Sequence, residues 1–263
     1  MKKFFLISLA LVISSSIIFS TTTKTSTAIK KQKRPVSGQP EIILLDSKIT
    51  KEWYSSLGWD YDLYINTIKN FLTQTKIKFT TISDEQLENL TFSENKILIL
   101  PNTRGMTKKS VESVKKYVLS GGKLFATYQT SIADEKYQKV VPNRFQLEDV
   151  FGAKWIRWAQ DWFSFGYIKK STETTIFNGL PETIKLYRNT AMIVTPLSGS
   201  TVVGIWINND KTTPSLPEDQ NAAIIVHKTV VYCGEDLFDP ENLKDENVQK
   251  LVKNIINYLL NKK

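Results

Sequence analysis

The feature that most constrains the fold is an alternation of short apolar runs with amphipathic segments in the first half of the chain. Runs of this kind are typical of strands in a parallel sheet that is covered on both faces. They occupy residues 42–46, 77–81, 96–100 and 123–127, and the last follows Gly121 and Gly122. Because strands and helices alternate, right-handed crossovers and a doubly wound, mostly parallel α/β sheet are expected.

The segments between these runs carry helix signals. Residues 53–72 place apolar side chains at three- and four-residue spacing, so one face of a helix is expected to pack on the sheet. Residues 83–86 form a capping box ahead of a short helix. Thr107 is expected to cap a further helix that ends at Gly121 or Gly122.

The C-terminal half has a different pattern. Residues 154–168 are dense in aromatic side chains, and short strand candidates follow at 183–186, 191–195 and 201–206. Residues 222–226 and 229–232 are expected to form a hairpin that turns at His227 and Lys228. This half is therefore predicted to be an antiparallel β insertion laid on the sheet.

The last helix is the clearest element of the sequence. Its apolar stripe runs from Val248 to Leu259, so one face is expected to cover the sheet. Asp239 precedes Pro240 and is predicted to be the N-cap of this helix. Glu235 and Asp236 lie just ahead of it, in the same acidic cluster.

The N-terminal residues have the pattern of an export signal. Residues 1–28 combine a basic start, an apolar stretch and a small-x-Ala cleavage signal ending at Ala28. We expect an exported protein, in the periplasm, in the envelope or outside the cell, with membrane anchoring if the leader is not cleaved. Residues 29–40 are predicted to be a basic Pro/Gly linker, and residues 41–263 the α/β domain.

The positive charge is concentrated ahead of this domain. The formal net charge is +9, and the seven basic residues that precede Pro35, with no acid among them, leave +2 for the rest of the chain. A nearly balanced domain gives no reason to expect a nucleic-acid partner. An alternative role for the linker is to tether the protein to an anionic envelope polymer or to lipid. The single Cys allows no internal disulfide.

Residues 98–152 resemble a known domain. Segments 99–102, 121–124, 127–135 and 147–152 are similar to the middle, or trimerisation, domain of family-42 β-galactosidases. That domain belongs to the class I glutamine amidotransferase-like fold, which is flavodoxin-like in architecture. The resemblance implies this fold and no activity, because the domain is non-catalytic in that family. The glycosidase carboxylates lie there in a separate barrel, which a chain of 263 residues is too short to contain.

The residues that catalysis would need are absent from the expected places. Amidotransferases of this class place a Cys, served by a His–Glu pair, at the elbow where this chain has Tyr128, Gln129 and Thr130. The only Cys and His, Cys233 and His227, would lie about 20 Å apart along one strand. No G-x-S-x-G, dinucleotide-binding or Walker motif occurs. The sequence therefore weighs against an enzyme, and no metal or other cofactor is expected.

Ligands of open α/β sheets bind at the carboxyl ends of the strands. The residues that follow these ends, with the acidic pair after the central turn, form a candidate ligand mouth: Asp46, Asn102, Thr103, Gln129, Thr130, Asp134 and Glu135. Most are uncharged and suit hydrogen bonds to hydroxyl groups better than acid–base catalysis. A carbohydrate-active hydrolase using Asp46, or Asp134 with Glu135, stays open as an alternative. So does a role of the acidic pair in loop hydrogen bonds or subunit contact.

Three tryptophans form a second candidate site. Trp155, Trp158 and Trp162 would share one face if their segment were helical, and flat aromatic rings suit a sugar ring, a subunit interface or packing of the insertion. The sequence thus favours an exported, non-catalytic domain that acts in binding or assembly. A carbohydrate, an envelope polymer, a second copy of the chain or another protein would be its partner.

Overall fold

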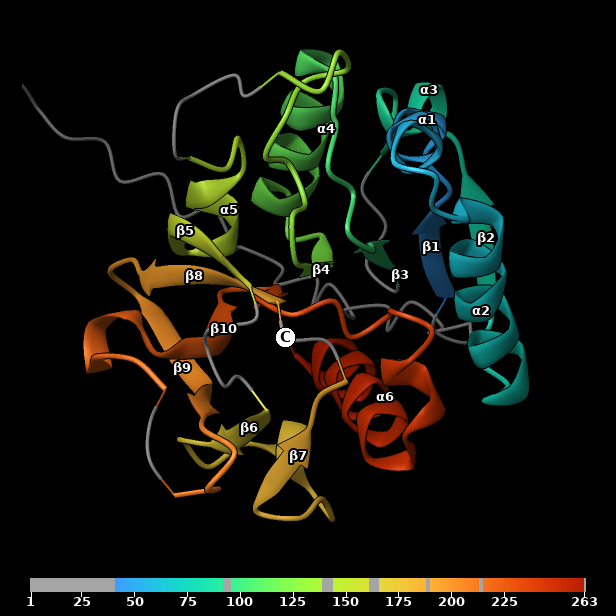
Figure 1. Cartoon of the computed structure of the whole chain (residues 1–263). Helices are drawn as coiled ribbons and strands as arrows, with labels where there is room; N and C mark the ends of the chain where they lie inside the picture. The colour runs from blue at the N-terminus through green and yellow to red at the C-terminus, as the bar shows by residue number, and fades with distance from the viewer. Residues whose placement is uncertain are drawn as a thin grey trace, which may run out of the picture. The chain divides into compact units, whose positions relative to one another are not determined.

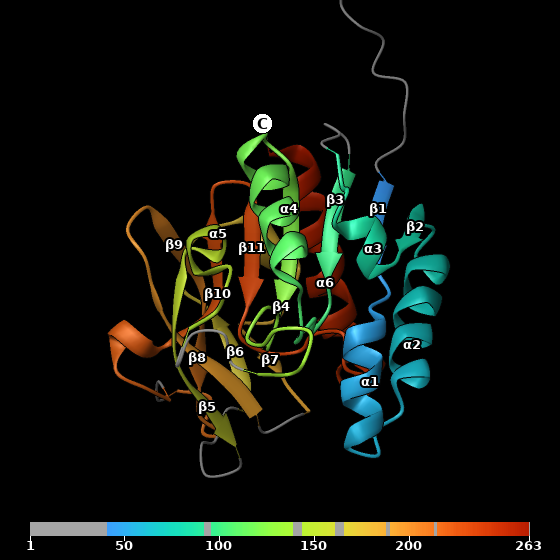
Figure 2. The same cartoon turned by 90° about the horizontal axis from the view of Figure 1, so that it is seen from above.

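The parallel strands have the order β2-β1-β3-β4-β11 in the computed structural model (Figure 1; β11 is labelled in Figure 2). The bounds are β1 (Glu41–Leu45), β2 (Phe79–Ile82), β3 (Lys96–Leu100), β4 (Lys123–Thr127) and β11 (Val230–Cys233). The structure describes residues 41–91, 96–138, 144–160, 166–187, 190–212 and 215–262. This strand order is typical of flavodoxin-like folds, so the predicted doubly wound, mostly parallel sheet is confirmed.

Antiparallel strands extend this sheet beyond β11. They are, in order, β10 (Ala222–His227), β9 (Ser200–Ile207), β6 (Tyr167–Lys170) and β7 (Thr183–Lys185). Among the described residues, β5 (Ala153–Gln160) and β8 (Thr190–Pro196) form a separate two-stranded sheet. The antiparallel C-terminal half and its hairpin are confirmed. Most of this half continues the main sheet instead of lying on it, because the free edge of β10 accepts β9.

The helices begin and end mostly at the predicted signals. Their bounds are α1 (Lys48–Ser56), α2 (Tyr61–Gln74), α3 (Asp84–Leu87), α4 (Lys108–Leu119), α5 (Glu148–Phe151) and α6 (Glu246–Asn261), with 3₁₀ turns at Thr175–Phe177, Glu218–Gln220 and Asn242–Lys244. A further helix, α1, precedes the expected one because Ser47 caps it. Gly58, at φ 72°, turns the chain, and Asp60 then caps α2. The N-cap of α6 is Asp245, so the predicted cap at Asp239 is wrong.

Alternating side chains of the strands divide the core between the two faces of the sheet. Ile42 and Leu44 of β1 belong to one apolar cluster, which includes the stripes of α2 and α6. Ile43 and Leu45 belong to the other, which includes the buried faces of α3, α4 and α5. Successive residues of a strand point to opposite faces, so both clusters follow from the continuous apolar runs. The expected position of the last helix over one face is confirmed (Figure 1).

Several predictions concern residues outside the described ranges. The signal peptide, the basic linker and Trp162 all lie there, so they stay predictions. Within the described ranges, no helix is both long enough and apolar enough to cross a membrane.

Because of Tyr117 in α4, the free energy of unfolding is expected to fall at alkaline pH. Its ring is buried against Gly122, and its hydroxyl donates a hydrogen bond to the Lys96 carbonyl oxygen at 2.9 Å. Burial raises the pKa of Tyr117 to about 12 from an ordinary value near 10. A raised pKa means that the stabilising effect is complete below pH 10 and is lost as the pH rises to about 12.

We therefore expect wild-type protein to lose about 2 to 3 kcal/mol more stability between pH 10 and 12 than Tyr117→Phe does. Urea unfolding at both pH values measures this difference. Tyr258→Phe, in the partly exposed last turns of α6, is the control and should behave as wild type. Equal losses in Tyr117→Phe and wild type would show that Tyr117 does not carry the effect.

Candidate functional site

The carboxyl ends of the parallel strands lie at one edge of the sheet, as the candidate mouth requires. Figure 2 shows β3, β4 and β11 ending side by side, with α1 on one flank and β5 on the other. Two hydrogen bonds join the loops after β3 and β4. The Asn102 amide donates to Thr127 Oγ1 and the Thr103 amide to Thr130 Oγ1, each at 3.1 Å. The structure thus brings the residues after neighbouring strands together.

The uncharged residues of the mouth are almost completely buried. Asn102, Thr103 and Thr130 are at most 1% exposed, and Gln129 is 8% exposed. The Thr130 hydroxyl lies 2.7 Å from the Thr127 carbonyl oxygen, and Asn102 Nδ2 donates to the Tyr54 hydroxyl at 3.1 Å. These side chains hold the loops to one another, which leaves little of them for a ligand.

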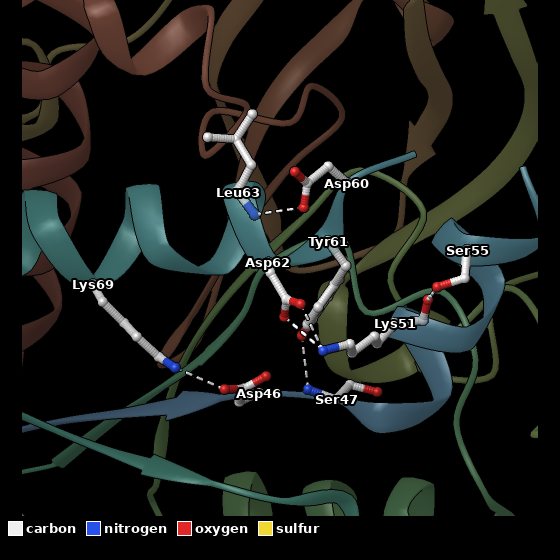
Figure 3. A network of polar contacts seen from close by, with 9 residues as sticks. All are labelled: Asp46, Ser47, Lys51, Ser55, Asp60, Tyr61, Asp62, Leu63 and Lys69. Atoms are coloured by element: carbon white, nitrogen blue, oxygen red, sulfur yellow. Dashed lines mark hydrogen bonds and ion pairs between the residues drawn. The ribbon is translucent and has the colours of Figure 1, made fainter. Parts of the chain in front are cut away.

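Asp46 is neutralised by a neighbouring helix. Figure 3 shows its carboxylate facing Lys69 of α2, with Oδ2 and Nζ 2.8 Å apart. The adjacent Ser47 amide donates to the Tyr61 hydroxyl at 2.8 Å, and Lys51 pairs with Asp62 at 2.6 Å. Asp46 therefore belongs to a polar network that ties the start of α1 and the face of α2 to the end of β1.

Asp134 and Glu135 do not form a pair of carboxylates facing a common ligand. Asp134 Oδ1 accepts hydrogen bonds from the amides of Lys136 and Gln138, at 2.9 and 2.8 Å. Its carboxylate shapes its own loop, which is the alternative given by the sequence. Glu135 is exposed to solvent.

Tyr128 occupies the elbow directly after β4. Its φ of 52° is left-handed, an unusual and strained conformation for an aromatic residue. Its amide donates to the Cys233 carbonyl oxygen at 2.8 Å, and its carbonyl oxygen accepts from the Tyr232 hydroxyl at 2.7 Å. The Tyr128 hydroxyl accepts a 2.6 Å hydrogen bond from Trp158 Nε1. The elbow after β4 thus holds a buried phenol.

The condition under which the three tryptophans would share a helical face is not met, because residues 153–160 form a strand. Trp155 and Trp158 lie on the strand β5, which has a register shift between Trp155 and Arg157. Trp155 is 5% exposed and packs near Phe145, whereas Trp158 is 43% exposed. The register shift places Trp155 opposite Val194 and Trp158 opposite Met192, which are two residues apart on β8, so both tryptophans point to the same side of the strand β5.

Cys233 and His227 do not contact each other. They lie on the two strands of the hairpin, and His227 pairs with Val230, three residues from Cys233. Three residues of strand span about 10 Å, less than the 20 Å of a single strand but far beyond hydrogen-bond reach. Burial raises the pKa of the Cys233 thiol far above its usual range, which disfavours the reactive thiolate.

His227 instead contacts a serine that the sequence did not single out. Its Nδ1 lies 3.0 Å from Ser200 Oγ, and that hydroxyl lies 2.8 Å from the Gly152 carbonyl oxygen, to which it donates. A hydroxyl has one proton, so Ser200 cannot donate it to the carbonyl and to the imidazole together. Burial and the charge of Lys228 lower the pKa of His227. The contact joins β9, β10 and the end of α5.

Two buried acids at the edge were given no site role by the sequence. Glu235 and Asp236 follow β11 and are 0% exposed. Asp236 Oδ1 accepts from the Tyr64 hydroxyl at 3.0 Å and the Phe238 amide at 3.2 Å, and Glu235 Oε1 accepts from Asn242 at 3.2 Å. The signal that selected Asp46, a polar residue directly after an apolar strand, does not select them, because Gly234 separates them from β11. No group of three or more His, Cys, Asp or Glu in the described residues is arranged to hold a metal.

Several solved structures are similar to this chain. A β-galactosidase from Bacillus circulans sp. alkalophilus matches with a TM-score of 0.59 and 15% identity, over 83% of this chain and 31% of that chain. A GH42 β-galactosidase from G. stearothermophilus gives 0.53 and 18%, over 79% and 29%. A ThuA-like protein from Bacteroides uniformis gives 0.58 and 11%, over 86% and 94%.

These likenesses show the fold alone. No family model matches the sequence, and no curated protein does. The chain spans less than a third of the length of these β-galactosidases, so their activity does not transfer to it. The expected likeness to family-42 β-galactosidases is confirmed at the level of the fold.

Proposed function

We propose that this chain is an exported, non-catalytic domain of amidotransferase-like fold that acts by binding or assembly in a carbohydrate-related setting. The observation that carries the proposal is Tyr128. Its buried ring fills the elbow after the central strand, and its hydroxyl is engaged by Trp158. A phenol held in this way is a poor replacement for a nucleophilic Cys.

The acids of the candidate ligand mouth support hydrolysis less well than they support binding. Glycosidases need two carboxyl groups that flank the scissile bond, one to donate a proton and one to act as nucleophile or base. Asp46 is paired with Lys69, and Asp134 is bound by backbone amides. Each of these carboxylates is already engaged within the fold, so we favour binding over turnover.

The carbohydrate-related setting rests on the kind of protein in which this fold occurs. Two of the solved structures reported above are β-galactosidases, in which a region of this fold makes up about 30% of the chain. The resemblance of residues 98–152 to the trimerisation domain of that family points the same way and adds assembly as a role. Export rests on the leader pattern of residues 1–28.

The test is a binding screen of the purified protein against neutral glycans, acidic glycans and anionic envelope polymers, with the solution mass measured alongside. We expect saturable binding to a glycan or polymer, a defined oligomer, or both. A monomer that binds none of them would overturn the proposal. If binding to polymer or anionic vesicles is lost on deletion of residues 30–34, the linker is a tether and the domain is not the binding element.

A further inference from the structure

Arg104 is a partly buried cation with no acid beside it. It follows β3 at the carboxyl edge of the sheet, and burial lowers its pKa. Among the described residues, no Asp or Glu forms an ion pair with it. The carboxylate of Glu52 lies instead 3.9 Å from Lys48 and 3.3 Å from the Tyr137 hydroxyl. A cation withdrawn from water without an acid in reach is unfavourable unless something else compensates for its charge.

The guanidinium group is held in one orientation. Its carbon Cζ lies 4.6 Å from the centroid of the Trp53 ring, in a cation–π contact. One terminal nitrogen, Nη1, donates to Gln129 Oε1 at 2.8 Å. These contacts fix the plane of the group and use one of its five N–H donors. An acceptor group of a ligand would therefore bind to a guanidinium that is already held in position.

One aromatic ring, Trp53, contacts this cation, and a second ring, Trp59, contacts Trp53. Trp59 lies 5.6 Å from Trp53 in an edge-to-face contact, and its side chain is 47% exposed. Trp53 is partly exposed as well. Both rings belong to α1 and the turn that follows it, the segment that flanks the carboxyl edge in Figure 2. In open α/β sheets this edge is where ligands bind.

We propose that Arg104, Trp53 and Trp59 form a binding site for a carboxylate-bearing sugar, such as a uronic acid residue of an acidic glycan. The carboxylate of the sugar pairs with the Arg104 guanidinium, and the sugar ring lies against the exposed parts of the two tryptophan side chains. A planar guanidinium matches a carboxylate in shape and charge. This inference rests on the proposed carbohydrate-binding function and specifies its ligand class.

The aromatic surroundings favour a sugar over a simple anion. A free carboxylate or an acidic peptide needs the cation alone, whereas two partly exposed rings beside it offer apolar area that only a ligand with an extended face would cover. The site also requires no catalytic group. It is therefore consistent with the loop-bound acids of the mouth.

The test compares two trisaccharides that differ in whether their carboxyl groups are charged or methyl-esterified. Trigalacturonic acid and its fully methyl-esterified form are titrated calorimetrically into the purified protein at low salt. We expect the acid to bind at least tenfold more tightly than the ester. Arg104→Met should abolish this preference, and Arg104→Lys should keep only part of it because the planar fork is lost. Trp59→Ala should weaken binding of both trisaccharides.

Two controls keep the outcome interpretable. Lys108→Met removes an exposed positive charge from the first turn of α4 and should leave the preference for the acid unchanged. Thermal unfolding of each variant separates a lost site from a lost fold. Equal binding of acid and ester, unaffected by Arg104→Met, would overturn this inference and leave carbohydrate binding intact. Binding of neither would overturn this inference and weaken the proposed function as well. A triglutamate peptide that binds as tightly as the trisaccharide, with the same Arg104 dependence, would rule out the sugar as the ligand.

Discussion

Asp236→Ala is expected to lower the free energy of unfolding by about 3 to 5 kcal/mol. The carboxylate is completely buried and accepts hydrogen bonds from the Tyr64 hydroxyl and the Phe238 amide, with Thr127 Oγ1 at 3.4 Å. Its removal leaves these donors buried without an acceptor, and each such loss costs about 1 to 3 kcal/mol. Denaturant unfolding at neutral pH measures the change.

Two further variants serve as comparisons for Asp236→Ala. Tyr64→Phe removes one donor and leaves the carboxylate its other contacts, so about 1 kcal/mol is expected. Asp62→Ala removes an exposed carboxylate that pairs with Lys51 and should cost less than about 1 kcal/mol. If Asp236→Ala costs no more than Asp62→Ala, the acid does not hold the edge of the sheet together.

Gly152→Ala is expected to cost about 3 to 4 kcal/mol. Gly152 has φ 64°, a left-handed conformation that side chains disfavour. A Cβ atom there would overlap Ser200 Oγ and lie 2.5 Å from the Cβ atom of His227. The change would therefore also separate the Ser200–His227 contact. Denaturant unfolding gives the loss in stability.

Gly58 provides a matched comparison. Its φ of 72° is similar, but nothing lies within 4 Å of a Cβ atom placed there. Gly58→Ala should therefore cost only the conformational penalty, about 1 to 2 kcal/mol. The difference between the two variants measures the steric overlap at Gly152. Equal losses would mean that the contact between α5, β9 and β10 relaxes without cost.

The sequence predicted the parallel half of the fold because its signals are local. The runs of β1, β3 and β4 are continuously apolar, and each is covered on both faces. The helix from Thr107 follows from its cap and its apolar face, and α6 from one long stripe. These patterns are set by burial and hardly depend on distant residues.

The remainder depends on contacts that a single sequence does not reveal. Residues 153–160 become a strand because β8 lies beside them, although their tryptophans also fit a helical spacing. The grouping of Asn102, Thr103, Gln129 and Thr130 at one edge was predictable, but their burial is not a local property. No pattern in the sequence pointed to Arg104 as a site residue, because a cation without an acidic partner is recognised only once its surroundings are known.

We propose that this edge of the sheet binds a ligand or a partner and does not catalyse a reaction. The most direct measurement is hydrolysis of aryl glycosides, galactosides among them, by the purified protein, with Asp134→Asn and Glu135→Gln assayed in parallel. We expect no turnover above the buffer rate for wild type or for either variant. Hydrolysis by the wild-type protein that is lost in Asp134→Asn would contradict this proposal.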